Sequence, residues 1–441
     1  MPVRNVREMI ILLILLLSLP AVVFGLFDET NGSATDSLSY DLSGYFRSSI
    51  FGWEAPENNI IQLQSAFCEV SLKLKIKKMP FGDGFCELRA NMTADNGEYS
   101  TEINLREGYI NLYPGKFSFR FGHQIVVWGR ADGFNPTDNI TPRDMLRFSA
   151  DEDDVRLGNL LLRSFYSAQP FRMEAVWIPL YCSSTLPTDI ISFPPGVTFQ
   201  DPEYPPGELK NSGYALKVNL LTSAADGSVS YFNGFNPSPG IDIIEETTTG
   251  IIVSPKAYRT HVIGVDLSTV IGRLFGFRGE FAYKKAYEPF ETNIHIPNPE
   301  LNYVFGVDKE YFGVFTIVFQ YMGKYVLEYT EPVPPVLPQE MAAYQIHLKN
   351  RMISLQQHEY MNAAFLRIGL NLLYETLKLE YMGMYRLTTE EFFYLMRMSY
   401  AIADALVCTL GVKVYSGPED SLYGTIGDHL SALYFDIKIS F

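Results

Sequence analysis

The chemically richest part of the sequence lies between residues 107 and 144, where guanidinium groups, carboxylates, an amide and an indole occur close together. The candidate site residues are Glu107, Arg120, Gln124, Trp128, Arg130, Asp132 and Asp138. Charges of both signs are expensive against lipid, but around a water-filled constriction they set ion preference. We expect Arg120 and Arg130 on the wall of such a constriction. They would face Asp132 and Asp138, carried by segment 129–153 folded inward; a segment that only covers the outer mouth is the alternative.

Three other kinds of site were considered. The acidic run 151–154 (Asp-Glu-Asp-Asp) could bind Ca²⁺ together with Asp144. A solvated acidic loop is the favoured interpretation, because no glycine-spaced calcium loop surrounds the run. The six His residues form no H-x-x-x-H or H-E-x-x-H pair. No G-x-S-x-G motif is present, although a hydrolase site could assemble across strands. We therefore expect no catalytic residue, no metal and no cofactor.

These residues must be positioned by strands, because apolar and polar residues alternate with a period of two along much of the chain. In the last segment the residues at 433, 435, 437, 439 and 441 are apolar, and Tyr434, Asp436, Lys438 and Ser440 lie between them. The same alternation places Leu370 on an apolar face and Asn371 on a polar one. Further alternating segments cover residues 70–76, 117–121 and 366–372.

Alternation predicts about eighteen strands, and the segments between them differ in length in a regular way. The strand centres fall near residues 44, 69, 89, 107, 122, 160, 175, 217, 231, 263, 281, 304, 319, 368, 380, 397, 410 and 435. Long polar connections are expected at 52–59, 94–100, 129–153, 182–210, 236–255, 287–299, 326–362 and 416–427, with 388–391 as a short exception. Short turns alternate with them. This is typical of outer-membrane barrels, which have short periplasmic turns and long external loops.

The predicted fold class is therefore all-β: a closed antiparallel transmembrane β-barrel over residues 37–441, with sixteen strands as the alternative count. After residue 26 the sequence has no apolar run long enough for a spanning helix, and a closed barrel can pair every backbone group within the hydrocarbon. Aromatic residues make up 14% of the chain and are spread along it, as the two interfacial girdles of a barrel require. Inward positions include Lys73, Glu87, Arg367 and Glu380.

The ends of the chain carry two further signals. Residues 1–25 have the basic, apolar and small-residue regions of a secretory signal peptide, and 26–36 would form a short periplasmic segment. Phe441 ends the last strand and is predicted to act as an assembly signal for the barrel-assembly machinery. The formal net charge of -15, with 35 Lys+Arg against 50 Asp+Glu, argues against nucleic acid as a partner.

Local register and loop structure can also be predicted. With the Pro114-Gly115 turn as pivot, Leu112 should face Phe117 and Asn111 should face Ser118, with a bulge above Gly108. If the preceding turn centres on Phe81, Cys86 pairs with Ile76 and Cys68 with Ala94, so a disulfide between the two cysteines is not expected. Residues 341–355 have helical spacing and predict an amphipathic helix that lies over or in the mouth of the barrel, or on its rim.

The pattern R-x-G-x-Q-x-x-x-W-G, followed by N-P-x-D and W-I-P, resembles a family of uncharacterised porin-like outer-membrane proteins of diderm bacteria. That family is distantly similar to the eighteen-stranded alginate-export porins. The matching residues are Arg120, Gly122, Gln124, Trp128, Gly129, Asn135, Pro136, Asp138, Trp177, Ile178 and Pro179. His123 departs from the pattern, where Arg or Lys is expected. The resemblance implies the barrel fold and leaves the solute undefined.

Together these features predict a porin-like channel in the bacterial outer membrane for passive or facilitated passage of small polar or charged solutes. The expected partners are outer-membrane lipid and the solutes, with a homo-oligomer left open. The alternative is an outer-membrane enzyme or a surface adhesin that uses the barrel as a platform; the mixed charges on the inner face favour a channel that is not an enzyme.

Overall fold

The computed structural model describes residues 38–54, 61–78, 81–95, 98–188, 190–247, 250–272, 274–337 and 340–441. The predicted signal peptide and the segment 26–36 lie outside these residues. None of the helices in the described ranges is long and apolar enough to cross a membrane.

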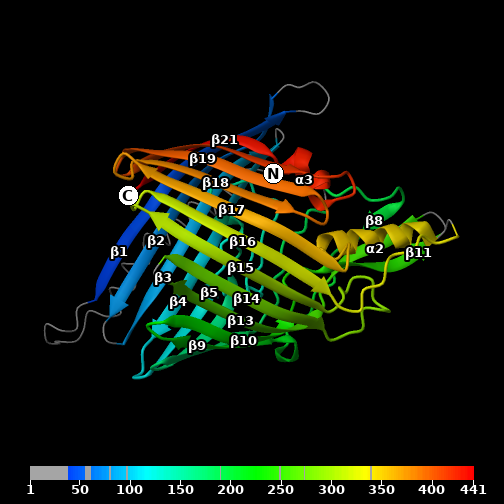
Figure 1. Cartoon of the computed structure of the whole chain (residues 1–441), viewed down its shortest axis with the longest axis horizontal. Coiled ribbons are helices and arrows are strands. Elements are labelled where there is room, and N and C mark those ends of the chain that lie inside the picture. Colours follow the sequence, from blue (N-terminus) through cyan, green and yellow to red (C-terminus); the bar gives the residue numbers. More distant parts are fainter. Residues whose placement is uncertain are drawn as a thin grey trace.

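Eighteen antiparallel strands form one sheet that closes on itself, because β1 pairs with both β2 and β21 (Figure 1). The strands are β1 (Ser39–Glu54), β2 (Ile61–Lys78), β3 (Gly82–Asp95), β4 (Glu98–Leu112), β5 (Phe117–Gln124), β6 (Asn159–Ala168), β7 (Phe171–Ile178), β9 (Gly213–Leu221), β10 (Ala225–Phe235), β13 (Arg259–Ile271), β14 (Phe275–Ala286), β15 (Glu300–Tyr311), β16 (Phe315–Val326), β17 (Tyr360–Leu372), β18 (Leu377–Arg386), β19 (Glu391–Ala403), β20 (Leu406–Ser416) and β21 (Ala432–Ser440). The predicted strand number is confirmed, and every predicted centre falls within a strand.

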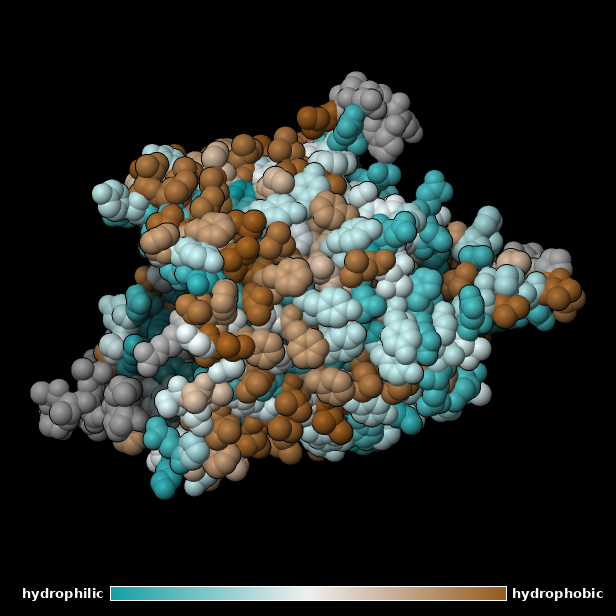
Figure 2. Space-filling view, in the orientation of Figure 1, coloured by the Kyte–Doolittle hydropathy of each residue, from teal (hydrophilic) through white to brown (hydrophobic). Residues whose placement is uncertain are grey.

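Side chains alternate between the lumen and the outer surface as the sequence pattern predicts. On β21, Leu433 and Phe435 are exposed on the outside, whereas Tyr434 and Asp436 are buried on the inside. Apolar side chains cover much of the strand wall in Figure 2, and hydrophilic ones gather toward the end that carries the long loops. This arrangement is that of a transmembrane barrel, in which the apolar band faces lipid and the polar face lines the interior.

The barrel closes at the pairing of β1 with β21. The backbone amide of Phe441 donates to the oxygen of Gly44 at 3.0 Å, and the amide of Gly44 donates to the oxygen of Phe441 at 2.9 Å. Gly44 also leaves room for the Phe441 ring, since a Cβ there would lie 2.8 Å from its Cζ. The last residue therefore belongs to the seam of the barrel.

The long loops at the external end contain structure of their own. A three-stranded sheet consists of β8 (Val197–Phe199), β11 (Gly240–Thr247) and β12 (Gly250–Lys256). The predicted amphipathic helix is present as α2 (Met341–Ile353) and lies beside this sheet in Figure 1, with its buried Ile346 in one apolar cluster with Ile241 and Val253. The small sheet and the helix α3 (Leu422–Leu430) were not predicted.

Three local predictions need correction. Leu112 pairs with Phe119 and Asn111 with Arg120, two residues from the predicted register. Cys86 pairs with Leu74 and Cys68 with Met92, again displaced by two residues. The expected long connection 94–100 is short, because β3 reaches Asp95 and β4 begins at Glu98. The bulge above Gly108 is present, since Leu105 and Glu107 pair with consecutive residues of β3, and all four cysteines are free.

Candidate functional site

The connection 125–158 between β5 and β6 enters the lumen. Gln124 and Asn159 are paired at its base, so both strands remain in the wall while the connection leaves it. The amides of Arg130 and Ala131 donate to Glu280 on β14, and the amide of Gly133 donates to Gln320 on β16 at 2.8 Å. This supports the prediction that the segment folds inward. We call residues 125–158 the lumenal loop.

The tip of the lumenal loop reaches the far wall. Asp132 lies 2.6 Å from Arg278 on β14 and 3.6 Å from Arg367 on β17, between carboxylate oxygen and guanidinium nitrogen. β17 is nine strands from β5 in either direction round the 18-stranded ring. The loop therefore spans the lumen from one side to the other.

Ion pairs continue along the wall from these contacts. Arg130 lies 2.5 Å from Asp266 on β13, Arg367 lies 2.7 Å from Glu380 on β18, and Arg397 on β19 lies 2.5 Å from the other oxygen of Glu380. We call this chain of alternating charges the lumenal belt: Arg130, Asp132, Asp266, Arg278, Arg367, Glu380 and Arg397. Its arginine side chains are 24–41% exposed, whereas Asp266 is 1% and Glu380 13% exposed, so guanidinium groups face the open lumen more than carboxylates do.

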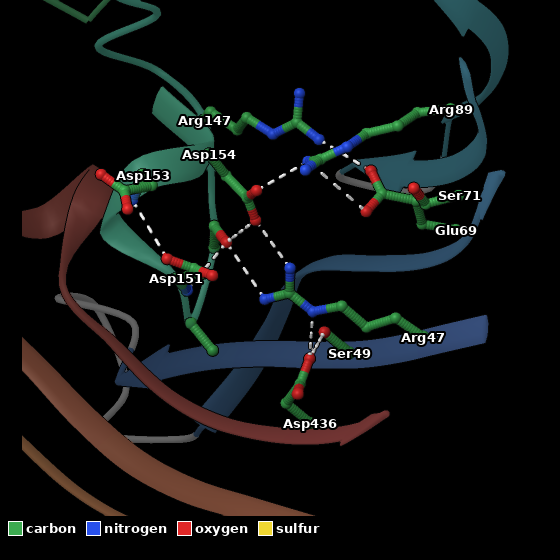
Figure 3. A network of polar contacts seen from close by, with 12 residues as sticks. Arg47, Ser49, Glu69, Ser71, Arg89, Arg147, Asp151, Asp153, Asp154 and Asp436 are labelled. Carbon is green, nitrogen blue, oxygen red and sulfur yellow. Dashed lines mark hydrogen bonds and ion pairs between the residues drawn. The ribbon is translucent and has the colours of Figure 1, made fainter. Parts of the chain in front are cut away.

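A second set of ion pairs holds the other half of the loop near the seam (Figure 3). Asp154, in the short helix η1 (Glu152–Val155), lies 2.6 Å from Arg47 on β1 and 2.7 Å from Arg89 on β3. Arg47 also lies 2.6 Å from Asp436 on β21. Arg147 of the loop lies 2.9 Å from Glu69 on β2. We call Arg47, Glu69, Arg89, Arg147, Asp154 and Asp436 the seam cluster.

The acidic run 151–154 is thus an anchor, and its prediction as a solvated loop is wrong at Asp154. This side chain is 4% exposed, while that of Asp153 is 82% exposed. Burial alone would raise the pKa of Asp154, but Arg47 and Arg89 outweigh burial and hold the pKa well below its usual range. With two guanidinium partners, the carboxylate has no need of a cation. No group of three or more metal-ligating side chains occurs in the described part of the chain.

Two predicted pore-lining residues belong instead to the packing beneath the loop. Gln124 is fully buried and donates to the oxygen of Leu161 at 3.0 Å. Trp128 is 4% exposed and packs in a cluster with Val126, Ile140 and Leu161, so it contributes to an apolar core inside the barrel. Their prediction as lining residues was wrong because the returning loop covers them.

Arg120 and Glu107 are also placed differently from the prediction. Arg120 donates from Nε to Asn111 at 2.7 Å, and its guanidinium lies 4.1 Å from the centre of the Tyr109 ring. Among the described residues it has no ion pair with Asp132 or Asp138. Glu107 accepts a hydrogen bond from the amide of Ile125 at 2.9 Å and so holds the start of the loop.

The remaining predicted residues are in the loop, but their partners differ. Arg130 and Asp132 join the lumenal belt without pairing with each other. Asp138 lies 3.1 Å from Arg143 and 2.8 Å from Arg156, within the loop itself. The prediction that Arg120 and Arg130 face Asp132 and Asp138 is therefore wrong.

Sequence reasoning missed Asp266, Arg278 and Arg397 as site residues. Each occupies an inward position of its strand, which the alternation could have shown. Arg367 and Glu380 were placed on the inner face, as the structure confirms. Which inward charges meet the loop depends on its path across the lumen, and no local pattern encodes that path.

Known proteins resemble this chain in structure and not in sequence. No family model matches the chain, and no curated protein matches its sequence. The outer membrane protein opdK of Pseudomonas aeruginosa is similar in structure, with a TM-score of 0.52 and 6% identity, over 91% of this chain and 99% of that chain. OccAB1 of Acinetobacter baumannii has a TM-score of 0.51 and 9% identity, over 93% and 99% of the two chains. OccAB4 of the same species gives 0.51 and 9%, over 93% and 100%.

The closed barrel, its outward apolar band and these structural similarities agree: the chain has the fold of an outer-membrane porin. The predicted fold class is confirmed, and the location that this fold indicates is the bacterial outer membrane.

Proposed function

We propose that the chain is a channel for small polar or charged solutes, constricted by the lumenal loop. The observation that carries this proposal is the lumenal belt, in which Asp132 at the loop tip contacts arginines on two strands of the far wall. A loop that needed only to cap the mouth would gain nothing from charged contacts so deep in the barrel. A partly hydrated belt of charges of both signs is suited to selecting solutes by charge.

The exposure of the belt side chains also suggests which sign of charge the channel prefers. The side chains of Arg367 and Arg278 are 41% and 32% exposed, more than their partner Asp132 at 20%. Solutes passing the belt therefore meet guanidinium groups first, and these favour anions and the polar groups that accept hydrogen bonds.

Planar-bilayer recordings of the refolded protein test both statements. The wild-type barrel should conduct, and Arg367→Gln should shift the reversal potential under a KCl gradient toward cation selectivity. Lys285→Gln, at an exposed position on the outer face of β14, is the matched control and should leave the reversal potential unchanged. Correctly refolded barrels that carry no current would favour the platform alternative, an outer-membrane enzyme or a surface adhesin.

Two finer statements belong to the same proposal. Phe441 would be read by the barrel-assembly machinery, which is supported by its backbone pairing at the seam. Membership of the porin-like family distantly similar to alginate-export porins rests on the sequence signature around Arg120 and Trp128.

A further inference from the structure

A cavity in the external half of the lumen differs from the charged belt in its chemistry. It has a volume of about 260 Å³ and lies between the tip of the lumenal loop and the inner faces of β16, β17 and β18. Its apolar lining includes Phe134, Met322, Met361, Ala363, Met384 and Tyr423. Tyr423 belongs to α3, so the cavity lies between the lumenal loop and this helix.

The apolar lining continues into a packed cluster. Met322, Phe365 and Met382 are buried in one hydrophobic group with Ala131 of the loop, and Ala363 and Met384 are only partly buried against it. Gly133 makes this contact possible, because a Cβ there would already lie 3.0 Å from the Phe365 ring. Beyond the tip the loop no longer covers the apolar wall, and Phe134 remains 40% exposed beside the cavity.

The cavity also contains no free charge. Lys324 lines it but lies 2.7 Å from Glu300, and Arg386 lines it but lies 3.0 Å from the buried Glu391. Arg386 in addition stacks on Tyr423, with its guanidinium 4.0 Å from the ring centre. Both cations are therefore already neutralised, and the surface left for a solute is mainly apolar.

We infer that this cavity binds the apolar part of an amphipathic solute, whose polar part then faces the lumenal belt. The inference rests on the proposed channel function and names the class of solute. Apolar surface in contact with lumen water is unfavourable. An alkyl group that displaces this water gains binding free energy in proportion to the apolar area that becomes buried. Uncharged alkyl chains fit the lining better than ions do, because no unpaired cation or carboxylate of the described residues faces the cavity.

Channel block by alkyl glucosides tests the inference, since methyl, propyl and pentyl glucosides share one neutral polar group and differ only in chain length. In planar bilayers, the residence time of each solute should rise roughly threefold to fourfold for each added CH₂. Ala363→Phe fills the cavity and should abolish this dependence while the channel still conducts. Ala364→Phe, on the outer face of the same strand, should behave as wild type.

Met384→Ser is a second test, which makes the cavity lining more polar without filling the cavity. It should weaken the dependence of residence time on alkyl chain length. A dependence that persists in both Ala363→Phe and Met384→Ser would overturn the inference, as would its absence from the conducting wild-type barrel. A wild-type barrel that does not conduct at all would instead reject the proposed channel function, so the two failures are distinguishable.

Discussion

At the scale of single residues, Asp154 is the most consequential side chain of the lumenal loop. Its two oxygens separately contact Arg47 and Arg89, and Ser149 donates to one of them at 2.6 Å. Each arginine has another carboxylate partner, Asp436 for Arg47 and Glu87 for Arg89. Removing Asp154 therefore takes one carboxylate partner from each of two buried guanidinium groups, which is far more costly than losing a surface pair.

The first prediction is that Asp154→Asn destabilises the barrel by about 3 kcal/mol, the lower end of the range for breaking a buried pair, since each arginine keeps at least one carboxylate partner. The measurement is the free energy of unfolding in urea in lipid vesicles. Asp153→Asn is the control, because that side chain is 82% exposed. Equal stabilities of the two variants would show that the seam cluster does not hold the loop.

The second prediction concerns pH. The folded pKa of Asp154 is depressed, so its contribution to stability is fully present above the unfolded value of about 3.9 and is lost as pH falls toward the folded pKa. Unfolding free energy in wild type should therefore exceed that of Asp154→Asn by a constant amount between pH 5 and pH 8. The difference should shrink only below about pH 4. A difference that vanishes near pH 6 would contradict this assignment.

At the scale of elements, the strands were predictable and their register was not. Each strand must place apolar residues toward lipid and polar ones inward, so the alternation on β17 or β21 is a local signal. A shift of two residues keeps every side chain on the same face, and the pattern therefore cannot detect it. That is why Asn111 was matched to Ser118 although it pairs with Arg120.

The loop contacts were beyond sequence reasoning for a different reason. The pairs Asp132–Arg367 and Arg47–Asp154 join residues 235 and 107 positions apart, which is 367 minus 132 and 154 minus 47. Whether such pairs form depends on the path of the whole loop backbone across the lumen. The sequence showed that segment 129–153 is charged and long, and it could not show which wall residues the charges meet.

The third prediction tests the lipid face of β17. Leu366 lies in the middle of the strand opposite Phe319, whereas Leu370 lies near its periplasmic end. Leu366→Arg should destabilise the barrel by about 2–4 kcal/mol, and Leu370→Arg by about 0–1 kcal/mol, because the cost of a cation falls toward the interface. The measurement is refolding equilibrium in vesicles. Equal costs would mean that the membrane does not surround the barrel at this height.

The fourth prediction concerns the seam. Deleting residues 439–441 removes the backbone pairs between Phe441 and Gly44 and shortens the pairing of β21 with β1. An unpaired strand edge in hydrocarbon is strongly unfavourable, so assembly should fail although export continues. The measurement is the heat-modifiable, folded form in outer-membrane fractions. Ser440→Ala is the control and should assemble as wild type does; normal assembly of the deletion would contradict the prediction.

At the scale of the whole molecule, the lumenal loop is fixed at opposite sides of the barrel. Its tip is held by the lumenal belt on β13 to β18, and its second half by the seam cluster on β1 to β3 and β21. A loop tied at one side could swing, but one tied at both divides the lumen. The helix α2 and the small three-stranded sheet lie together at one end of the barrel (Figure 1).

The last prediction follows from this division of the lumen. Gln124 and Asn159 pair directly, so a short Gly-containing turn can replace residues 125–158 without breaking the ladder between β5 and β6. The wall residues that lose partners, such as Arg47 and Asp266, would then be hydrated by lumen water, and the barrel should still assemble. Single-channel conductance should rise several-fold, and the charge selectivity that depends on Arg367 should weaken. A shortened barrel with wild-type conductance would place the constriction elsewhere and reject the lumenal loop as its cause.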